Sequence, residues 1–207
     1  MPTPSRNIQA VVWGGLGLVV LGVVGVFFLA PPAKPLPVYG SVPGFSLSNQ
    51  DGQIVTDANW RGHVTVVDLI FSRCAGQCLL MSATMKQLQD ALPSSPVVAL
   101  VSLTCDPDYD TPAILKKYGG KFGARDGVWS FLTGPKKTLH EVAVGGLKLV
   151  AQEKAAADQE TSADLFLHST KLVLIDQQGR IRAYFDGETS QCIPAVLAAI
   201  RQLGREP

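Results

Sequence analysis

The chain carries little net charge and few cysteines. Its 207 residues include 18 basic and 17 acidic side chains, which leaves a formal net charge of +1. The sequence shows no stripe of basic residues, so nucleic-acid binding has no support. Four cysteines are too few for a disulfide scaffold in a chain of this length. A hydrophobic core must therefore hold the fold together.

The N-terminal region lacks charge altogether. No charged residue occurs over 8–33, and residues 10–30 form an unbroken apolar stretch of the length that a transmembrane helix needs. The alternative is a cleaved signal peptide, whose shorter apolar region ends in a small-x-small motif. Phe28 stands where a small residue would be wanted, and no cysteine follows that could carry a lipid. We therefore expect residues 1–35 to be an uncleaved single-pass anchor, with its helix over about 10–30.

The charges that flank this stretch bear on its orientation. Arg6 precedes it and Lys34 follows it, so the positive-inside rule favours a cytoplasmic N-terminus by a small margin. The rest of the chain would then lie outside the cytoplasm, in a periplasm or an equivalent oxidising space. The prolines and glycines of residues 36–44 predict a stiff linker. Residues 45–207 are expected to be one monomeric domain.

Hydrophobic periodicity predicts the elements of this domain. Apolar, β-branched runs at 63–71, 96–104 and 128–133 are typical of buried strands. Residues 171–185 predict two strands joined by a turn, and residues 190–203 predict a closing helix. The order predicts an α/β fold of the thioredoxin-like type, with a central mixed sheet flanked by helices.

Three further segments complete this pattern. Apolar residues from Met81 to Leu92 recur on one face of a predicted helix that ends before Pro93. Thr111 is expected to cap a helix that ends at Gly119. The small and polar residues 151–163 predict a solvated loop or a frayed helix.

Two cysteines follow the first buried run, where the strand is expected to turn into a helix. Sites form at such carboxyl ends of strands. On a helix Cys74 and Cys78 would share one face, and the helix N-terminus and Arg73 would favour the Cys74 thiolate. Two thiolates suit Cu(I) or Zn(II), and they suit a reversible disulfide equally well. A pair of buried apolar cysteines is the third interpretation.

Asp68, Cys105 and Cys192 are further candidates with two interpretations each. Asp68 lies inside the apolar strand before Cys74. It is either a desolvated carboxyl with a raised pKa that could accept a proton, or a structural carboxylate held by a hydrogen bond. Cys105 ends the neighbouring strand, where it is either an additional ligand or a small buried apolar residue. Cys192 is expected to be a semi-buried helix residue, and a Cys105–Cys192 disulfide is not expected.

Four segments together resemble the Sco/SenC family. They are "FSRCAGQCLLMSATMKQLQDAL", "VSLTCDPDYDTPAILKKYG", "WSFLTG" and "LHSTKLVLIDQQGRIRAYFDG", and the resemblance covers roughly residues 45–187. C-x3-C alone is a weak signal. C-x3-C, D-P-x-x-D-T-P and a histidine before the late strand, in this order, are a specific one. Members of this family are membrane-anchored copper chaperones of cytochrome c oxidase assembly with a thioredoxin-like fold.

The resemblance implies a copper site made by Cys74, Cys78 and His168. Two thiolates and one imidazole would hold Cu(I), with Cu(II) left open. It implies a protein that delivers Cu(I) to, or maintains the thiols of, the copper site of a respiratory cytochrome c oxidase. The partners would be the oxidase subunit that carries this site, or another cuproprotein, and a thiol–disulfide reductant. His63 and His140 match no position of the family and are expected at the surface.

The alternative function is enzymatic. A thiol–disulfide oxidoreductase outside the cytoplasm would use Cys74 as nucleophile and Cys78 as resolving thiol. Asp68 would accept the proton, since thioredoxins carry a buried aspartate at the same offset. His168 separates the two functions, because a disulfide reductase has no need of an imidazole there.

Overall fold

The computed structural model describes residues 13–22, 34–74, 76–92, 97–155, 157, 161 and 165–206. The chain divides into two compact units, Met1–Lys34 and Pro35–Pro207. Residues 13–22 are helical, and the rest of the predicted transmembrane helix lies outside the described residues. None of the helices described has the length and hydropathy to cross a membrane. The membrane anchor therefore stays a prediction.

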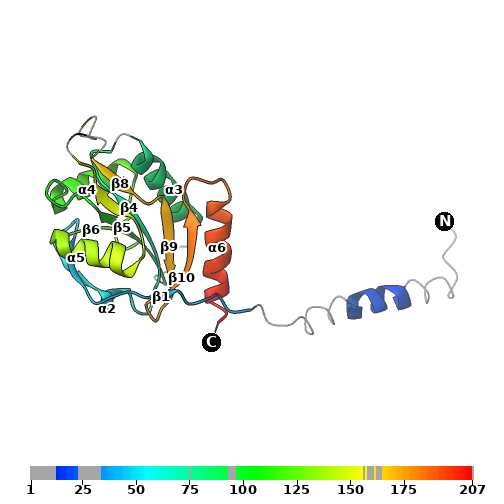
Figure 1. Cartoon of the computed structure of the whole chain (residues 1–207). Helices are drawn as coiled ribbons and strands as arrows, with labels where there is room; N and C mark the ends of the chain where they lie inside the picture. The colour runs from blue at the N-terminus through cyan, green and yellow to red at the C-terminus, as the bar shows by residue number, and fades with distance from the viewer. Residues whose placement is uncertain are drawn as a thin grey trace. The chain divides into compact units, whose positions relative to one another are not determined.

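The second unit is built around a mixed sheet (Figure 1). Its described strands are ordered β1-β10-β9-β4-β5-β6-β2-β3. The pairs β4–β5 and β5–β6 are parallel, and the other pairs are antiparallel. The bounds are β1 Gly40–Ser41, β2 Ser46–Asn49, β3 Ile54–Thr56, β4 Val64–Ile70, β5 Val98–Thr104, β6 Trp129–Thr133, β9 Lys171–Ile175 and β10 Arg180–Asp186. The predicted central mixed sheet is confirmed.

Helices cover both faces of this sheet. One core lies under α3 (Gln77–Ala91), α4 (Pro112–Lys121) and α6 (Cys192–Leu203), and it contains Met81, Met85, Leu88, Leu115, Tyr118 and Val196. The other core lies under α5 (Lys136–His140) and the π-helix Glu141–Gly146 that continues it, and it includes Trp60 of α2 (Asp57–Trp60). Figure 1 shows α5 and α6 on opposite sides of the sheet. The flanking helices are therefore where the sequence predicts them.

β4 lies in the middle of the sheet and is buried at every residue. Val64, Val66 and Ile70 belong to the core under α3, whereas Val67 and Leu69 belong to the core under α5. Side chains alternate along a strand, so Asp68 lies on the α3 side. Both β4 and β5 end at the edge where the cysteine loop begins. This edge carries the candidate site.

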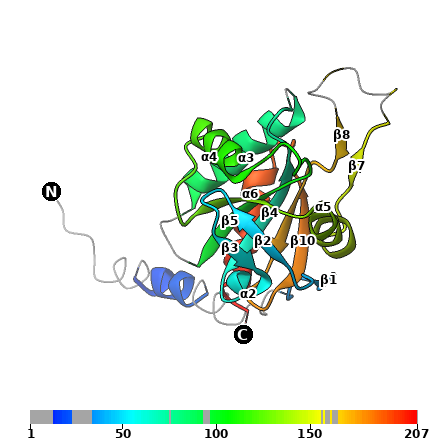
Figure 2. The ribbon, with the colours of Figure 1, turned by 90° about the vertical axis from the view of Figure 1, so that its left-hand side faces the viewer.

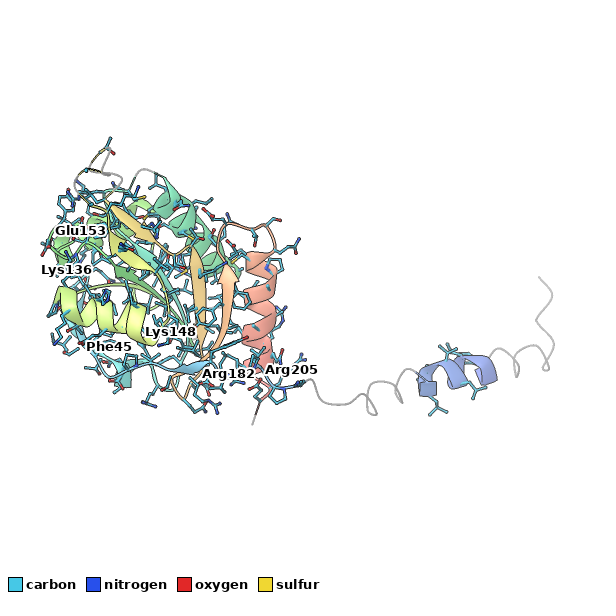
Figure 3. All side chains as sticks on the ribbon, in the orientation of Figure 1. Phe45, Lys136, Lys148, Glu153, Arg182 and Arg205 are labelled. Carbon is cyan, nitrogen blue, oxygen red and sulfur yellow. The ribbon has the colours of Figure 1, made fainter. Side chains whose placement is uncertain are left out.

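A second, two-stranded sheet corrects the prediction for residues 151–163. β7 (Ala151–Glu153) pairs antiparallel with β8 (Phe166–His168), with Ala151 opposite His168. Figure 2 shows this hairpin beside the main sheet. Lys136 and Glu153, labelled in Figure 3, form an ion pair of 2.7 Å between α5 and the hairpin. The polar residues of β7 gave no strand signal because two of its three side chains are exposed.

Residues 36–44, which we predicted to be a linker, contact the domain. β1 pairs with β10, and the Leu36 amide donates to Glu206 Oε1 at 2.8 Å. The buried Arg182 side chain donates to the carbonyl oxygens of Leu36 and Pro37 at 2.6 and 3.1 Å, and Figure 3 shows it at the end of the domain near Arg205. The ordered domain thus begins ahead of residue 45, because these backbone groups are held by hydrogen bonds.

The end of α4 also differs from its prediction. The helix continues through Gly119 to Lys121, and the residue with a left-handed φ of 64° is Gly123. Gly119 is needed for space, because a Cβ there would lie 2.6 Å from the Phe131 ring.

Candidate metal centre

Three side chains converge at the carboxyl edge of the sheet. The ligand atoms of Cys74, Cys78 and His168 all lie within 4.8 Å of one another. They come from the loop after β4, the first turn of α3 and the end of β8. Of the groups that the described residues form, this is the one whose ligand types and spacing could hold a metal ion.

Cys74 does not lie on a helix, contrary to the prediction. α3 begins at Gln77 with Gly76 as its N-cap, and the Cys74 amide donates to the Phe71 carbonyl at 3.1 Å in a turn. The two sulfurs therefore meet through the loop rather than through helical spacing. Cys78 is fully buried and Cys74 is half-buried, so solvent and a partner can reach the first sulfur only.

The two thiols differ in acidity because they share a hydrogen bond. The Cys78 thiol donates to Cys74, and this hydrogen bond lowers the pKa of Cys74 to about 4 against the opposing effect of burial. The same hydrogen bond and burial raise the pKa of Cys78. The reduced site thus holds one thiolate at Cys74 and one thiol at Cys78 at neutral pH.

The positive charge of Arg73 is paired with Asp106 rather than with the Cys74 thiolate. Its guanidinium donates to Asp106 Oδ2 from Nε at 3.0 Å and from Nη2 at 2.5 Å. It also lies over the Tyr109 ring, 4.3 Å from the centroid. The prediction that Arg73 favours the Cys74 thiolate was therefore wrong. The start of α3 does favour it, as predicted, because the backbone amides of Gly76 and Cys78 also lower the pKa of Cys74, after the larger effect of the Cys78 thiol.

The backbone carbonyl of Ser169 orients the His168 ring. Since a carbonyl oxygen only accepts, Nδ1 is the nitrogen that donates its proton to the Ser169 carbonyl, at 3.2 Å. Nε2 is left with a lone pair and faces the Cys78 sulfur at 3.0 Å. The ring packs edge-on against Phe71, with centroids 5.8 Å apart. A carbonyl that fixes the tautomer in this way is typical of histidine ligands.

The spacing of the three atoms fits a small, soft ion. Bonds of about 2.0 Å to nitrogen and 2.3 Å to sulfur, the lengths seen at zinc sites, put neighbouring ligands of a trigonal site roughly 3.7–4.0 Å apart. Cys78 Sγ and His168 Nε2, 3.0 Å apart, would need to separate by less than about 1 Å. Two sulfurs and one imidazole are the donor set that Cu(I) accepts.

The other cysteines lie outside this group. Cys105 donates its thiol proton to the Ile70 carbonyl at 3.2 Å, and burial raises its pKa. Cys192 lies at the start of α6 and is buried rather than semi-buried as predicted, because it packs in the core under this helix. Both are free thiols, and Cys105 is not among the ligand atoms that converge. His140 is exposed and His63 is half-buried.

Asp68 is fully buried, and its two carboxylate oxygens differ in their hydrogen bonding. Ser102 Oγ donates to its Oδ1 at 2.6 Å, and Trp129 Nε1 donates to Ser102 Oγ at 2.9 Å. Its Oδ2 has no hydrogen-bond partner among the described residues. Burial raises the pKa of Asp68 to about 7. Its strand neighbours Val66 and Ile70 belong to the core that contains Cys78, so the carboxyl and the thiol lie on the same face of the sheet.

Two aspartates that the sequence analysis did not single out also touch the cysteine loop. Asp106 and Asp110 belong to the D-P-x-x-D-T-P segment, and they accept hydrogen bonds from Arg73 and Ser72. The motif was visible in the sequence, but periodicity does not reveal which loop it contacts.

Comparisons with known proteins agree with this geometry. A model of the SCO1/SenC family matches residues 38–203. A curated relative, a SCO1 protein homolog of Bacillus subtilis, is 28% identical over 170 residues, which are 80% of this chain and 85% of the relative.

Solved structures show the same fold. BsSco, described as a Sco-family cytochrome c oxidase assembly protein with a disulfide switch, has a TM-score of 0.71 at 24% identity over 84% of this chain and 100% of its own. Copper-bound ScoI of Bradyrhizobium japonicum has a TM-score of 0.67 at 21% identity over 79% of this chain and 99% of its own. The Sco-type, thioredoxin-like fold is therefore confirmed.

Proposed function

Because this chain belongs to the SCO1/SenC family, we propose that it binds one Cu(I) through Cys74, Cys78 and His168. It delivers this ion to, or maintains the thiols of, the copper site of a respiratory cytochrome c oxidase. Copper is here an ion that the protein transfers, and not a resident cofactor. The observation that carries the proposal is the convergence of two sulfurs and one imidazole nitrogen within 4.8 Å.

The residues around the site are suited to a protein partner. Cys74 is half-buried, so an incoming thiolate from a client could reach the ion from that side. Leu79 and Leu80 follow Cys78, and Leu167 precedes His168; all three side chains are exposed. Exposed apolar side chains beside a site favour contact with another protein. The client would be the copper-site subunit of the oxidase or another cuproprotein, and a thiol–disulfide reductant would keep the two cysteines reduced.

The proposal includes a membrane anchor at residues 1–35. It is supported by the uncharged stretch from Ile8 to Ala33. The domain would then lie on the extracytoplasmic side of the membrane. Residues 36–207 produced alone should be soluble and monomeric, whereas the full chain should sediment with membranes. A truncated protein that still requires detergent would contradict this division.

A competition titration with a Cu(I) chelator tests the site. The full chain, reduced and in mild detergent, should bind one Cu(I). His168→Ala removes one of three ligands and should weaken binding by at least about 10–100-fold, the range seen for changes around metal ligands. His140→Ala, an exposed histidine, is the matched control, and Cys105→Ser should have little effect. Equal affinity of wild type and His168→Ala would overturn the proposed ligand set.

A second function is favoured by Asp68. In a thiol–disulfide oxidoreductase, the Cys74 thiolate attacks a partner's disulfide and releases one partner thiolate, which leaves a mixed disulfide. Cys78 then loses its proton to Asp68 and attacks the Cys74 sulfur. The second partner thiolate leaves, the partner's disulfide is reduced, and Cys74–Cys78 is oxidised. The buried carboxyl with a free oxygen is the group that such a step needs.

Asp68→Asn separates the two functions. It should slow thiol–disulfide exchange while copper affinity stays nearly unchanged, because Asp68 is not a ligand. Equal loss of both activities would mean that Asp68 is structural. Unchanged exchange rates would remove the main support for the enzymatic function.

A further inference from the structure

The two residues before Cys74 are each held by an aspartate from another loop. Ser72 contacts Asp110, and Arg73 contacts Asp106. Both aspartates lie between β5 and α4. Cys74 itself has no helix to fix it, since α3 begins only at Gln77. The position of its sulfur therefore depends on what holds this loop.

Asp110 is fully buried and accepts three hydrogen bonds. Its Oδ2 accepts from the Ser72 amide at 3.1 Å and from Thr104 Oγ1 at 2.5 Å, and its Oδ1 accepts from Ser72 Oγ. The carboxylate thus joins the cysteine loop to the end of β5. Hydrogen bonds to a buried carboxylate are stronger than those between neutral groups. Removing the carboxylate would leave its hydrogen-bond donors without an acceptor in the interior.

Asp106 provides the second attachment. It is buried, and both Nε and Nη2 of Arg73 donate to its Oδ2. The guanidinium also lies over the ring of Tyr109 in the same segment, 4.3 Å from its centroid. The Arg73 side chain is therefore held by two residues of one loop.

The loop that carries these groups is itself rigid. Its start is fixed by the parallel pairing of Thr104 with Ile70 and by the hydrogen bond from the Cys105 amide to Ile70, at 2.9 Å. Inside it, the Asp110 amide donates to the Asp106 carbonyl at 2.8 Å. At its end, Thr111 caps α4. Because this loop is held in place, its aspartates can hold the cysteine loop in one position.

We propose that Asp106 and Asp110 are positioning residues that hold Cys74 within ligand distance of Cys78 and His168. Neither residue is among the converging ligand groups. Without them the loop samples more conformations, so fewer molecules present three converging ligands, and the two thiols meet less often. The first consequence rests on the proposed copper function. The second, closure of the Cys74–Cys78 disulfide, does not.

The test compares four variants of the full chain in mild detergent. Asp110→Asn and Asp106→Asn perturb the attachments. Asp108→Asn is the matched control in the same loop, since its side chain is 84% exposed. Asp176→Asn controls for general destabilisation, because this buried carboxylate pairs with Arg182. It follows β9, whose pairing of Ile175 with Thr65 places it at the opposite end of β4 from the site.

Two quantities are measured for each variant: Cu(I) affinity, and the equilibrium constant of the metal-free Cys74–Cys78 disulfide with dithiothreitol. Asp110→Asn and Asp106→Asn should weaken copper binding by about 10-fold or more, and they should favour the dithiol form to a similar degree. Both controls should stay within about twofold of wild type.

A change for Asp110→Asn no larger than that for Asp176→Asn would overturn the proposal. If wild type does not bind copper, the proposed function fails, while the disulfide equilibrium still decides the positioning role. If Asp110→Asn does not fold, Asp106→Asn and Ser72→Ala decide it, since Ser72→Ala removes only the hydroxyl bond to Asp110. Wild-type disulfide equilibria in both of these would overturn the proposal as well.

Discussion

Replacing Asp68 with asparagine should change how stability depends on pH. The pKa of Asp68 is raised from 3.8 to about 7 by burial. Between these values the folded protein keeps the proton, whereas the unfolded chain has lost it. Stability therefore falls as pH rises through this window. A shift of about three units, at about 1.4 kcal/mol each, corresponds to roughly 4 kcal/mol as an upper bound.

Asp68→Asn removes this titration and keeps an acceptor for Ser102 Oγ. The variant should resemble wild type near pH 4.5, and it should be more stable by up to about 3–4 kcal/mol near pH 8. Urea denaturation of the reduced, metal-free protein at steps from pH 4.5 to 8 measures this difference. Asp108→Asn, at an exposed position, should show no such trend. Parallel curves for Asp68→Asn and wild type would mean that the buried carboxyl ionises with its ordinary pKa, and the reasoning would be refuted.

Three other predictions concern the site and the core. The Cys78 thiol lowers the pKa of Cys74 to about 4, so the rate at which iodoacetamide alkylates Cys74 should be nearly independent of pH from 5.5 to 8. Cys78 should not react. An alkylation rate that climbs towards pH 9 would contradict this prediction. Gly119→Ala should lower the free energy of unfolding by about 1–3 kcal/mol in urea denaturation, because its Cβ would overlap the Phe131 ring. A variant as stable as wild type would show that the ring moves freely. Arg182→Met should cost about 3 kcal/mol, because it takes one ion-pair partner from the buried Asp176, which keeps Arg180, and one from the half-buried Glu206. A neutral effect in the same assay would mean that the apolar side chain packs equally well.

Much of the fold could be predicted from the sequence because buried strands and amphipathic helices carry strong patterns. Five of the seven residues in each of β4 and β5 are apolar, and α3 repeats its buried residues with helical spacing. β7 lacks such a pattern because it belongs to a small hairpin with little burial. Residues 36–44 were rich in proline, and the partners that hold them, Arg182 and Glu206, lie far along the chain.

The candidate site could be predicted in its members but not in its geometry. Cys74, Cys78 and His168 were identified from cysteine spacing and family resemblance, and the structure brings them together. The sequence did not show that Cys74 precedes the helix, because Gly76 and Gln77 give no strong start signal. Nor did it show that Arg73 turns away to Asp106. Both depend on contacts between loops that are distant in sequence.

The ligand set of bound copper tests the account most directly. X-ray absorption at the copper edge of the reduced full chain should show two sulfur ligands and one imidazole nitrogen, because these atoms converge in the structure. His168→Ala should lose the imidazole signal and keep both sulfurs. A site with three sulfur ligands that is indifferent to His168→Ala would give the third position to Cys105 and contradict the account.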